Sequence, residues 1–198
     1  MQFDVILVGA GIGGLTAALA LQQQGLRVAL CEQANEPFVG GAGLVIGASG
    51  ARVLGQLGLG AALDDLAVRP AHIAIRHFQT GRLLAETPTS AGDGCRIGRA
   101  DLQRALIAAI HSNDRDCLRT GHTLADIGQD GSGLSALFGD RQMLRGSLLV
   151  ACDGQRSAVR TRLFGDEQPR FTGYQVWQGL VPMSHLTAAA PTLGDATV

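Results

Sequence analysis

The spacing of apolar residues changes twice within the first 32 residues of the chain. Asp4 to Val8 is a short apolar run rich in β-branched residues, which predicts a buried strand. From Leu15 the apolar side chains recur at helical spacing, and three glutamines, Gln22 to Gln24, followed by Gly25 predict the end of that helix. Val28 to Cys31 is a second apolar run. The pattern therefore predicts a strand, helix and strand of the size that a parallel crossover requires.

Later segments continue both patterns. Ile97 to Asn113 places its apolar residues on one face, which predicts an amphipathic helix starting near Gly98. Ala71 to Phe78 and Leu83 to Glu86 alternate around the turn sequence QTGR, as a hairpin would. Four further strands are predicted at His122 to Ile127, Leu134 to Phe138, Leu148 to Ala151 and Phe171 to Pro182, the first three separated by the turn signals GQDGSG and GDRQMLRG. The order of elements predicts an α/β fold.

A glycine cluster, GAGIGG, joins the first strand to the first helix. Gly9 would permit a tight turn, Gly11 would let a pyrophosphate approach the helix N-terminus, and Gly14 would let helix and strand pack closely. Glu32 follows Gly14 by 18 residues, near the ~20 typical of the acid that binds ribose hydroxyls. The alternative is a turn that is merely rich in glycine. The carboxylate disfavours a 2′-phosphate here, because like charges would meet, so NAD or FAD is favoured over NADP.

Composition excludes several classes of function. The 198 residues are 46% hydrophobic, which fits a folded chain of one domain or one and a part. A net charge of −1 provides no basic field for nucleic acid or an anionic membrane. All 16 basic residues are arginine, which excludes mechanisms that need a Schiff-base or P-loop lysine.

The cysteines and histidines lack the spacing of a metal site, so no metal is expected. We interpret the four cysteines as ordinary thiols of a reducing compartment. The chain starts directly on its first apolar run without a charged leader, and no apolar run reaches the length of a membrane span. We therefore expect a cytoplasmic protein.

Two further segments suggest ligand contacts. Arg99 falls in the first turn of the predicted helix, where a cation opposes the helix dipole, at a cost of a few tenths of a kcal/mol, unless an anion such as a phosphate lies nearby. The alternative is a solvated arginine paired with Asp101. The segment CDGQRSAVR follows Leu148 to Ala151, at the carboxyl end of a strand, where open parallel sheets bind ligands.

Three motifs in this order and spacing, GAGIGG with Glu32, GRADLQRAL and LLVACDGQRSAVR, resemble the FAD-dependent aromatic hydroxylases of the para-hydroxybenzoate hydroxylase class, the single-component flavoprotein monooxygenases. The resemblance runs from Val5 to Val181. It implies a Rossmann-like FAD-binding domain, a parallel sheet with a β-meander, at residues 1–70 and 96–168. It also implies an interleaved, incomplete antiparallel sheet of a substrate domain at residues 71–95 and 169–198.

The same resemblance assigns the cofactor contacts. FAD rather than NAD occupies the glycine turn, Glu32 binds the adenosine ribose, Arg99 contacts the FAD phosphates, and the main chain near Leu124 holds the adenine. Asp153 and Gly154 form a DG motif, closed by Arg160, that is implicated in binding both FAD and NADPH. The full implied set is Gly9, Gly11, Ile12, Gly13, Gly14, Glu32, Gln33, Val45, Arg99, Leu124, Asp153, Gly154 and Arg160.

The implied activity is hydroxylation of a small aromatic or heteroaromatic substrate, with NADPH or NADH reducing FAD and O2 entering through a flavin C4a-hydroperoxide. No catalytic acid or base is identified, because Val45 or Ile46 stands where some relatives carry a histidine. Tyr174 and Trp177 either line the substrate pocket or fill the core of its sheet. The substrate and a homodimeric state are left open.

A second FAD motif of the GD type is expected further along such a chain. GDAT at residues 194–197 resembles it but follows Asp153 by only 41 residues, without a strand before it, and we interpret it as a chance match. We therefore expect an N-terminal fragment that stops within the substrate domain and is inactive by itself. The alternatives are a catalytically inactive dinucleotide-binding fragment that needs a missing C-terminal part or a partner, and an NAD-dependent dehydrogenase.

Overall fold

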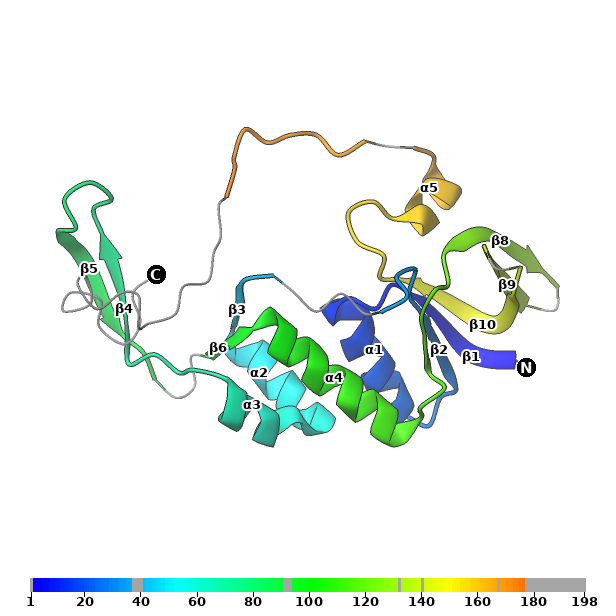
Figure 1. Cartoon of the computed structure of the whole chain (residues 1–198), viewed down its shortest axis with the longest axis horizontal. Coiled ribbons are helices and arrows are strands. Elements are labelled where there is room, and N and C mark those ends of the chain that lie inside the picture. The colour runs from blue at the N-terminus through cyan, green and yellow to red at the C-terminus, as the bar shows by residue number, and fades with distance from the viewer. Residues whose placement is uncertain are drawn as a thin grey trace.

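The computed structural model describes residues 2–36, 41–90, 94–131, 133–139, 141–166 and 168–176. Its strands are β1 (Gln2–Val8), β2 (Val28–Cys31), β3 (Gly43–Ile46), β4 (His72–Arg76), β5 (Leu83–Pro88), β6 (Cys95–Gly98), β7 (Leu118–Arg119), β8 (Leu124–Asp130), β9 (Gly133–Phe138) and β10 (Met143–Ala151). Its helices are α1 (Ile12–Gln23), α2 (Ala48–Leu54), the π-helical turn η1 (Gly55–Leu59), α3 (Gly60–Leu66), α4 (Arg99–Asn113) and α5 (Ala158–Phe164). Figure 1 shows their arrangement.

The main sheet of the described residues has the strand order β7-β2-β1-β10-β9-β8. β1 lies at its centre and pairs in parallel with β2 and with β10, so that Val8 lies between Cys31 and Ala151. β8, β9 and β10 form an antiparallel meander. The predicted fold class, a parallel sheet with a β-meander, is therefore confirmed for this part of the chain.

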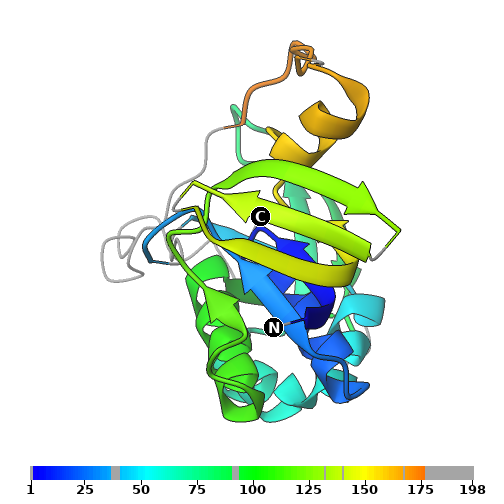
Figure 2. The same cartoon turned by 90° about the vertical axis from the view of Figure 1, so that its right-hand side faces the viewer.

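Two apolar clusters cover the sheet. The larger contains Val5 and Leu7 of β1 together with the buried faces of α1 and α4, which lie side by side (Figure 1). The smaller contains Phe3 and Ile6 together with Phe138 of the meander, which curls beside β1 in Figure 2. The fixed packing around β1 sets the position of its carboxyl end, where the glycine turn begins.

Two smaller ladders complete the described strands. β3 pairs antiparallel with β6, and β4 pairs antiparallel with β5 as the predicted hairpin. Figure 1 places this hairpin at the opposite end of the molecule from β8 and β9. The residues of the hairpin fall between α3 and β6 in the sequence.

Several predicted boundaries are wrong. α1 starts at Ile12 rather than Leu15, so Gly13 and Gly14 belong to its first turn. β8 and β10 are longer than expected, because pairing with β9 extends them through residues that the turn signals had marked as loops. The sequence also did not predict β3, α2, η1 and α3, since glycines interrupt the apolar pattern of residues 43–66.

The predicted strand at Phe171 to Pro182 is not formed over residues 171–176. There the side chain of Tyr174 is 85% exposed, and no described strand pairs with this segment. Residues 177–182, with Trp177, and the GDAT segment lie outside the described residues. Among the described helices, none is both long and apolar enough to cross a bilayer.

Candidate functional site

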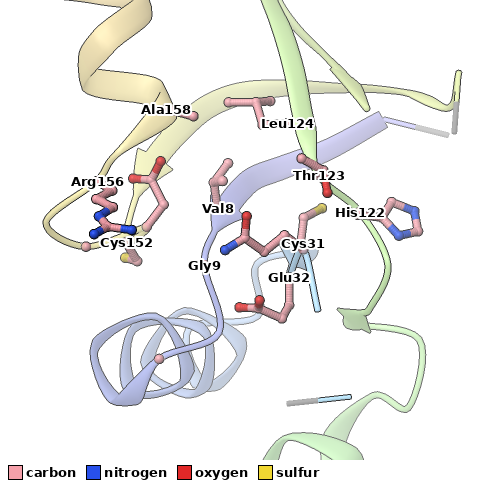
Figure 3. A pocket seen from close by; sticks show the side chains of 14 residues that line it. Val8, Gly9, Cys31, Glu32, His122, Thr123, Leu124, Cys152, Arg156 and Ala158 are labelled. Atoms are coloured by element: carbon pink, nitrogen blue, oxygen red, sulfur yellow. The ribbon is translucent and has the colours of Figure 1, made fainter. Parts of the chain in front are cut away.

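A cleft of about 520 Å³ opens at the carboxyl ends of β2, β1 and β10 (Figure 3). In Figure 3, Val8 and Gly9 lie between Cys152 and Arg156 on one side and Glu32 on the other. The position, beside the central strand of an open sheet, is where α/β folds bind ligands. Seven of the predicted site residues line it: Gly9, Gly11, Glu32, Gln33, Leu124, Asp153 and Gly154.

The turn after β1 is built from glycines with little surrounding space. Gly9 has φ +101°, and a Cβ added to it would lie 2.5 Å from the carbonyl oxygen of Cys152. A Cβ added to Gly14 would overlap the carbonyl oxygen of Gly9. This geometry agrees with the tight turn and the close helix–strand packing expected of these two positions.

Gly11 faces the other way, into open space. It is the N-cap of α1, no side chain caps this helix, and a Cβ on Gly11 or Gly13 would meet no atom within 4 Å. The first N–H groups of a helix have no partners within it, and together with the helix dipole they attract anions. Ile12 and Gly13 contribute these N–H groups, although neither lines the cleft. The start of α1 thus presents uncapped N–H groups beside open space, where an anion could bind.

The carboxylate of Glu32 connects two backbone segments at the base of the cleft. Its Oε2 accepts a hydrogen bond of 2.8 Å from the N–H of Ala10, and its Oε1 accepts one of 2.9 Å from the N–H of Ala34. Each carboxylate oxygen can accept a further hydrogen bond. Glu32 therefore fixes the glycine turn and still offers acceptors to the hydroxyls of a ribose.

Arg99 begins α4 and lies outside the lining of the cleft. It does not form the alternative pair with Asp101, because Asp101 pairs with Arg104 one turn further along. The stem of Arg99 passes Gly41, where a Cβ would lie 3.1 Å from the Arg99 Cδ. No ion pair of the Arg99 guanidinium is found within the part of the chain that the structure describes, so this group could contact an anion.

The DG motif forms the opposite wall. The Asp153 carboxylate accepts a hydrogen bond of 3.1 Å from the N–H of Val159 in the first turn of α5. Gly154 has φ +77°, which favours glycine. The Arg160 side chain donates a hydrogen bond of 2.6 Å to the carbonyl of Gln155, and thereby closes the loop from outside the cleft. Asp153 thus positions α5 as well as lining the site.

Val45 is separated from this cleft. It lies on β3 with its side chain 74% exposed, and it borders a cavity of about 50 Å³ shared with Thr89 and Arg96. The structure therefore brings most of the predicted cofactor residues together at one cleft and its rim, and places Val45 elsewhere.

Sequence reasoning missed several residues of the cleft lining: Cys31, His122, Thr123, Cys152 and Arg156. Burial raises the pKa of the Cys152 thiol, and the neighbouring Asp153 carboxylate raises it further. His122 pairs its backbone N–H with the carbonyl of Glu32 at 2.8 Å. Sequence analysis could have identified these residues from their position, because they lie at or near the ends of strands that it predicted. No cluster of His, Cys, Asp or Glu that could hold a metal ion is found among the described residues.

Comparison with known proteins identifies the family. The profile of the FAD binding domain family matches residues 2–183. An FAD-dependent urate hydroxylase of Klebsiella pneumoniae is 32% identical over 190 residues, which are 92% of this chain and 49% of that protein. The 3-amino-4-hydroxybenzoate 2-monooxygenase PtmB3 of Streptomyces platensis is 34% identical over 191 residues, covering 92% and 47% of the two chains.

Solved structures agree. Klebsiella pneumoniae HpxO complexed with FAD and uric acid superposes with a TM-score of 0.71 at 28% identity, over 80% of this chain and 41% of that one. Pseudomonas aeruginosa PqsL in complex with 2-aminobenzoylacetate gives a TM-score of 0.74 at 28% identity, over 86% and 48%. The chain spans about half the length of the curated relatives it matches. By its matching profile and its cleft, the chain belongs to the FAD binding domain family, together with the FAD-dependent aromatic hydroxylases.

Proposed function

We propose that this chain forms the FAD-binding part of a monooxygenase that uses NADPH or NADH and O2 to hydroxylate a small aromatic or heteroaromatic ring. The observation that carries the proposal is the cleft, where a glycine turn, an uncapped helix N-terminus and an acid at the end of β2 meet. These groups match the pyrophosphate and ribose of a dinucleotide in chemistry and in order along the cleft.

Each group then has a binding role. Glu32 accepts from the adenosine ribose, with Gln33 beside it, and the main chain at Leu124 borders the adenine. The first turn of α1 and the Arg99 guanidinium neutralise the pyrophosphate. Bound FAD would supply the electron transfer and the oxygen chemistry. The protein orients the cofactor and excludes water.

The remaining residues are proposed to serve the rest of the cofactor. Gly154 and Arg160 shape the DG loop that would contact both FAD and the nicotinamide donor, while Asp153 keeps α5 in place. Val45, on the separate β3–β6 ladder, would lie toward the flavin end of an extended FAD. We assign no catalytic acid or base.

The substrate class follows from the relatives rather than from a described pocket. The names of two relatives specify urate and 3-amino-4-hydroxybenzoate, both small rings. We propose that residues 71–95 and 169–198 belong to the substrate side, and that residues 1–70 and 96–168 hold FAD. The inserted β4–β5 hairpin supports this division. A cytoplasmic location agrees with four free thiols.

A second proposal concerns the chain taken alone. Because it spans about half the length of its curated relatives, we propose that the 198-residue chain binds FAD without turnover and needs further protein for hydroxylation. This second proposal is tested by the oxidation of NADPH or NADH by the FAD-loaded chain in the presence of candidate aromatic acids: no substrate-dependent oxidation is expected, and turnover by the chain alone would contradict it.

The cofactor assignment is tested by flavin retention. The purified chain, incubated with FAD and desalted, is expected to keep the visible absorbance of the flavin. Glu32→Gln should weaken FAD binding about tenfold or more, because the amide turns a donor toward the N–H of Ala10 or Ala34 and removes an acceptor. The matched control is Glu36→Gln at an exposed position beyond the cleft. A folded chain that retains no flavin, or equal affinities for the two variants, would contradict the assignment.

A further inference from the structure

Gln103 is a buried polar side chain that none of the proposed binding roles uses. It lies on α4 with 4% of its surface exposed, and within the described residues only Ser157 is another buried polar side chain. Its Nε2 donates a hydrogen bond of 3.4 Å to the carbonyl oxygen of Ala10. Because a carbonyl only accepts, the amide nitrogen of Gln103 must face Ala10.

The peptide groups of Ala10 are therefore held from two directions. Its N–H donates to Glu32 at the end of β2, and its carbonyl accepts from Gln103 on α4. Ala10 is 2% exposed and lies between Gly9 and Gly11, the two glycines of the turn that line the cleft. Gln103 is thus a link between the glycine turn and a helix that is remote in sequence.

This link lies at one end of a parallel helix pair. At the other end, Asn113 of α4 donates a hydrogen bond of 3.4 Å to Gln22 of α1. The start of α4 contacts the segment just before α1, and the end of α4 contacts the end of α1. The two helices therefore run in the same direction, as Figure 1 shows. Their N-termini, each carrying a positive partial charge, therefore lie at the same end of the pair. Arg99 lies four residues before Gln103, on the same side of α4.

We propose that Gln103 is a positioning residue, which fixes α4 against the glycine turn so that Arg99 and the N-terminus of α1 reach the same pyrophosphate. The inference rests on the proposed function, because the anion is that of FAD. It assigns to Gln103 no contact with the cofactor. Gln103 affects FAD binding indirectly, because it fixes the positions of Ala10 and Arg99.

The test compares two glutamines, of which Gln103 connects α4 to the glycine turn before α1 and Gln22 connects the end of α1 to the end of α4. Gln103→Met keeps the length of the side chain but removes the donor to Ala10, and Gln22→Met keeps the length but removes the acceptor for Asn113, away from the cleft. Gln103→Met is expected to weaken FAD binding roughly fivefold to tenfold, whereas Gln22→Met should leave the affinity unchanged at a similar melting temperature. In an Arg99→Met background the effect of Gln103→Met should shrink, since both act on one phosphate contact.

Gln103→Glu adds a readout that a purely structural role would not change. A protonated carboxyl can donate to the Ala10 carbonyl, whereas an ionised one cannot. The FAD affinity of this variant, relative to the unchanged chain, should therefore recover as the pH is lowered from about 8 to about 5.5, because burial raises the pKa of a carboxyl. A pH-independent ratio would contradict the proposal.

Amide hydrogen exchange in the absence of FAD separates this inference from the cofactor assignment. Gln103→Met should accelerate exchange within residues 10–14, and Gln22→Met should not. If the unchanged chain binds no FAD, the proposed function fails, and exchange alone then decides whether Gln103 holds the turn. Unaltered exchange in Gln103→Met, or FAD affinity equal to that of the unchanged chain, would overturn the role of Gln103.

Discussion

Gly13 and Gly14 are adjacent in the first turn of α1 but have different surroundings. A Cβ on Gly14 would overlap the carbonyl oxygen of Gly9 and approach the Cys152 side chain at 3.2 Å, whereas one on Gly13 would meet nothing within 4 Å. In the GxGxxG motif Gly14 is the third glycine, whereas Gly13 occupies a variable position. The structure shows that only Gly14 is required for the packing of α1 on β1.

This difference predicts opposite effects of one substitution. Gly14→Ala should lower the free energy of unfolding by about 3 kcal/mol or more, since backbone must shift to remove the overlap. Gly13→Ala should leave stability unchanged or raise it by up to about 1 kcal/mol, because alanine favours the helix. Denaturant unfolding of the chain without FAD measures both. Equal destabilisation by the two substitutions would contradict this account of the turn.

At the scale of elements, α5 is short and depends on its N-terminal contacts. Ser157 is buried, and its Oγ accepts a hydrogen bond of 2.9 Å from the N–H of Arg160. Asp153 accepts from Val159 in the same turn. These two bonds satisfy N–H groups in the first turn, which have no partner within the helix. They also connect the DG motif to the helix that follows it.

Removing the cap should loosen α5 without unfolding the sheet. We expect Ser157→Ala to destabilise the helix by about 1 kcal/mol, the usual effect of losing an N-cap. Hydrogen exchange of residues 158–164 should accelerate, while exchange in β1 and β10 should stay slow. Ser112→Ala, at an exposed position near the end of α4, is the matched control. Slow exchange of α5 in Ser157→Ala would show that the cap is not what holds this helix.

The elements that were predicted correctly share a property. β1, β2 and α4 have continuous or strongly periodic apolar patterns, because they lie in the core. α2, η1 and α3 were missed, since their stretch is rich in glycine and buries only scattered leucines such as Leu54 and Leu63. These helices are stabilised by packing against α4, β6 and one another, which a local pattern does not contain.

At the scale of the whole molecule, large apolar side chains outside the lining of the cleft remain on the surface. The exposed fractions are 87% for Phe78 next to β4, 79% for Phe164 at the end of α5, and 76% for Phe171. Together these side chains leave apolar surface uncovered, and uncovered apolar surface favours association between copies of a chain. The hairpin also has exposed strand edges, since β4 and β5 pair only with each other among the described strands.

The isolated chain is therefore expected to self-associate. Light scattering after gel filtration should show species larger than a monomer, and a hydrophobic dye should bind. Replacing Phe164 and Phe171 together by serine should reduce both signals with little change in melting temperature, because neither side chain is buried. Phe138→Ser, in the core, is the contrasting variant and should unfold the meander. A monodisperse monomer that binds no dye would count against this expectation.

The sequence alone determined the parts of this protein whose chemistry is local: the strand, glycine turn and helix, the acid at the end of β2, and the resemblance to FAD-dependent hydroxylases. These features depend on the spacing of residues along the sequence, which can be recognised without knowledge of the fold. Only the tertiary structure decided which distant segments meet at the turn. The link from Gln103 to Ala10 joins residues 93 positions apart. Such contacts depend on how helices pack on a sheet, and packing is a property of the whole chain rather than of any segment.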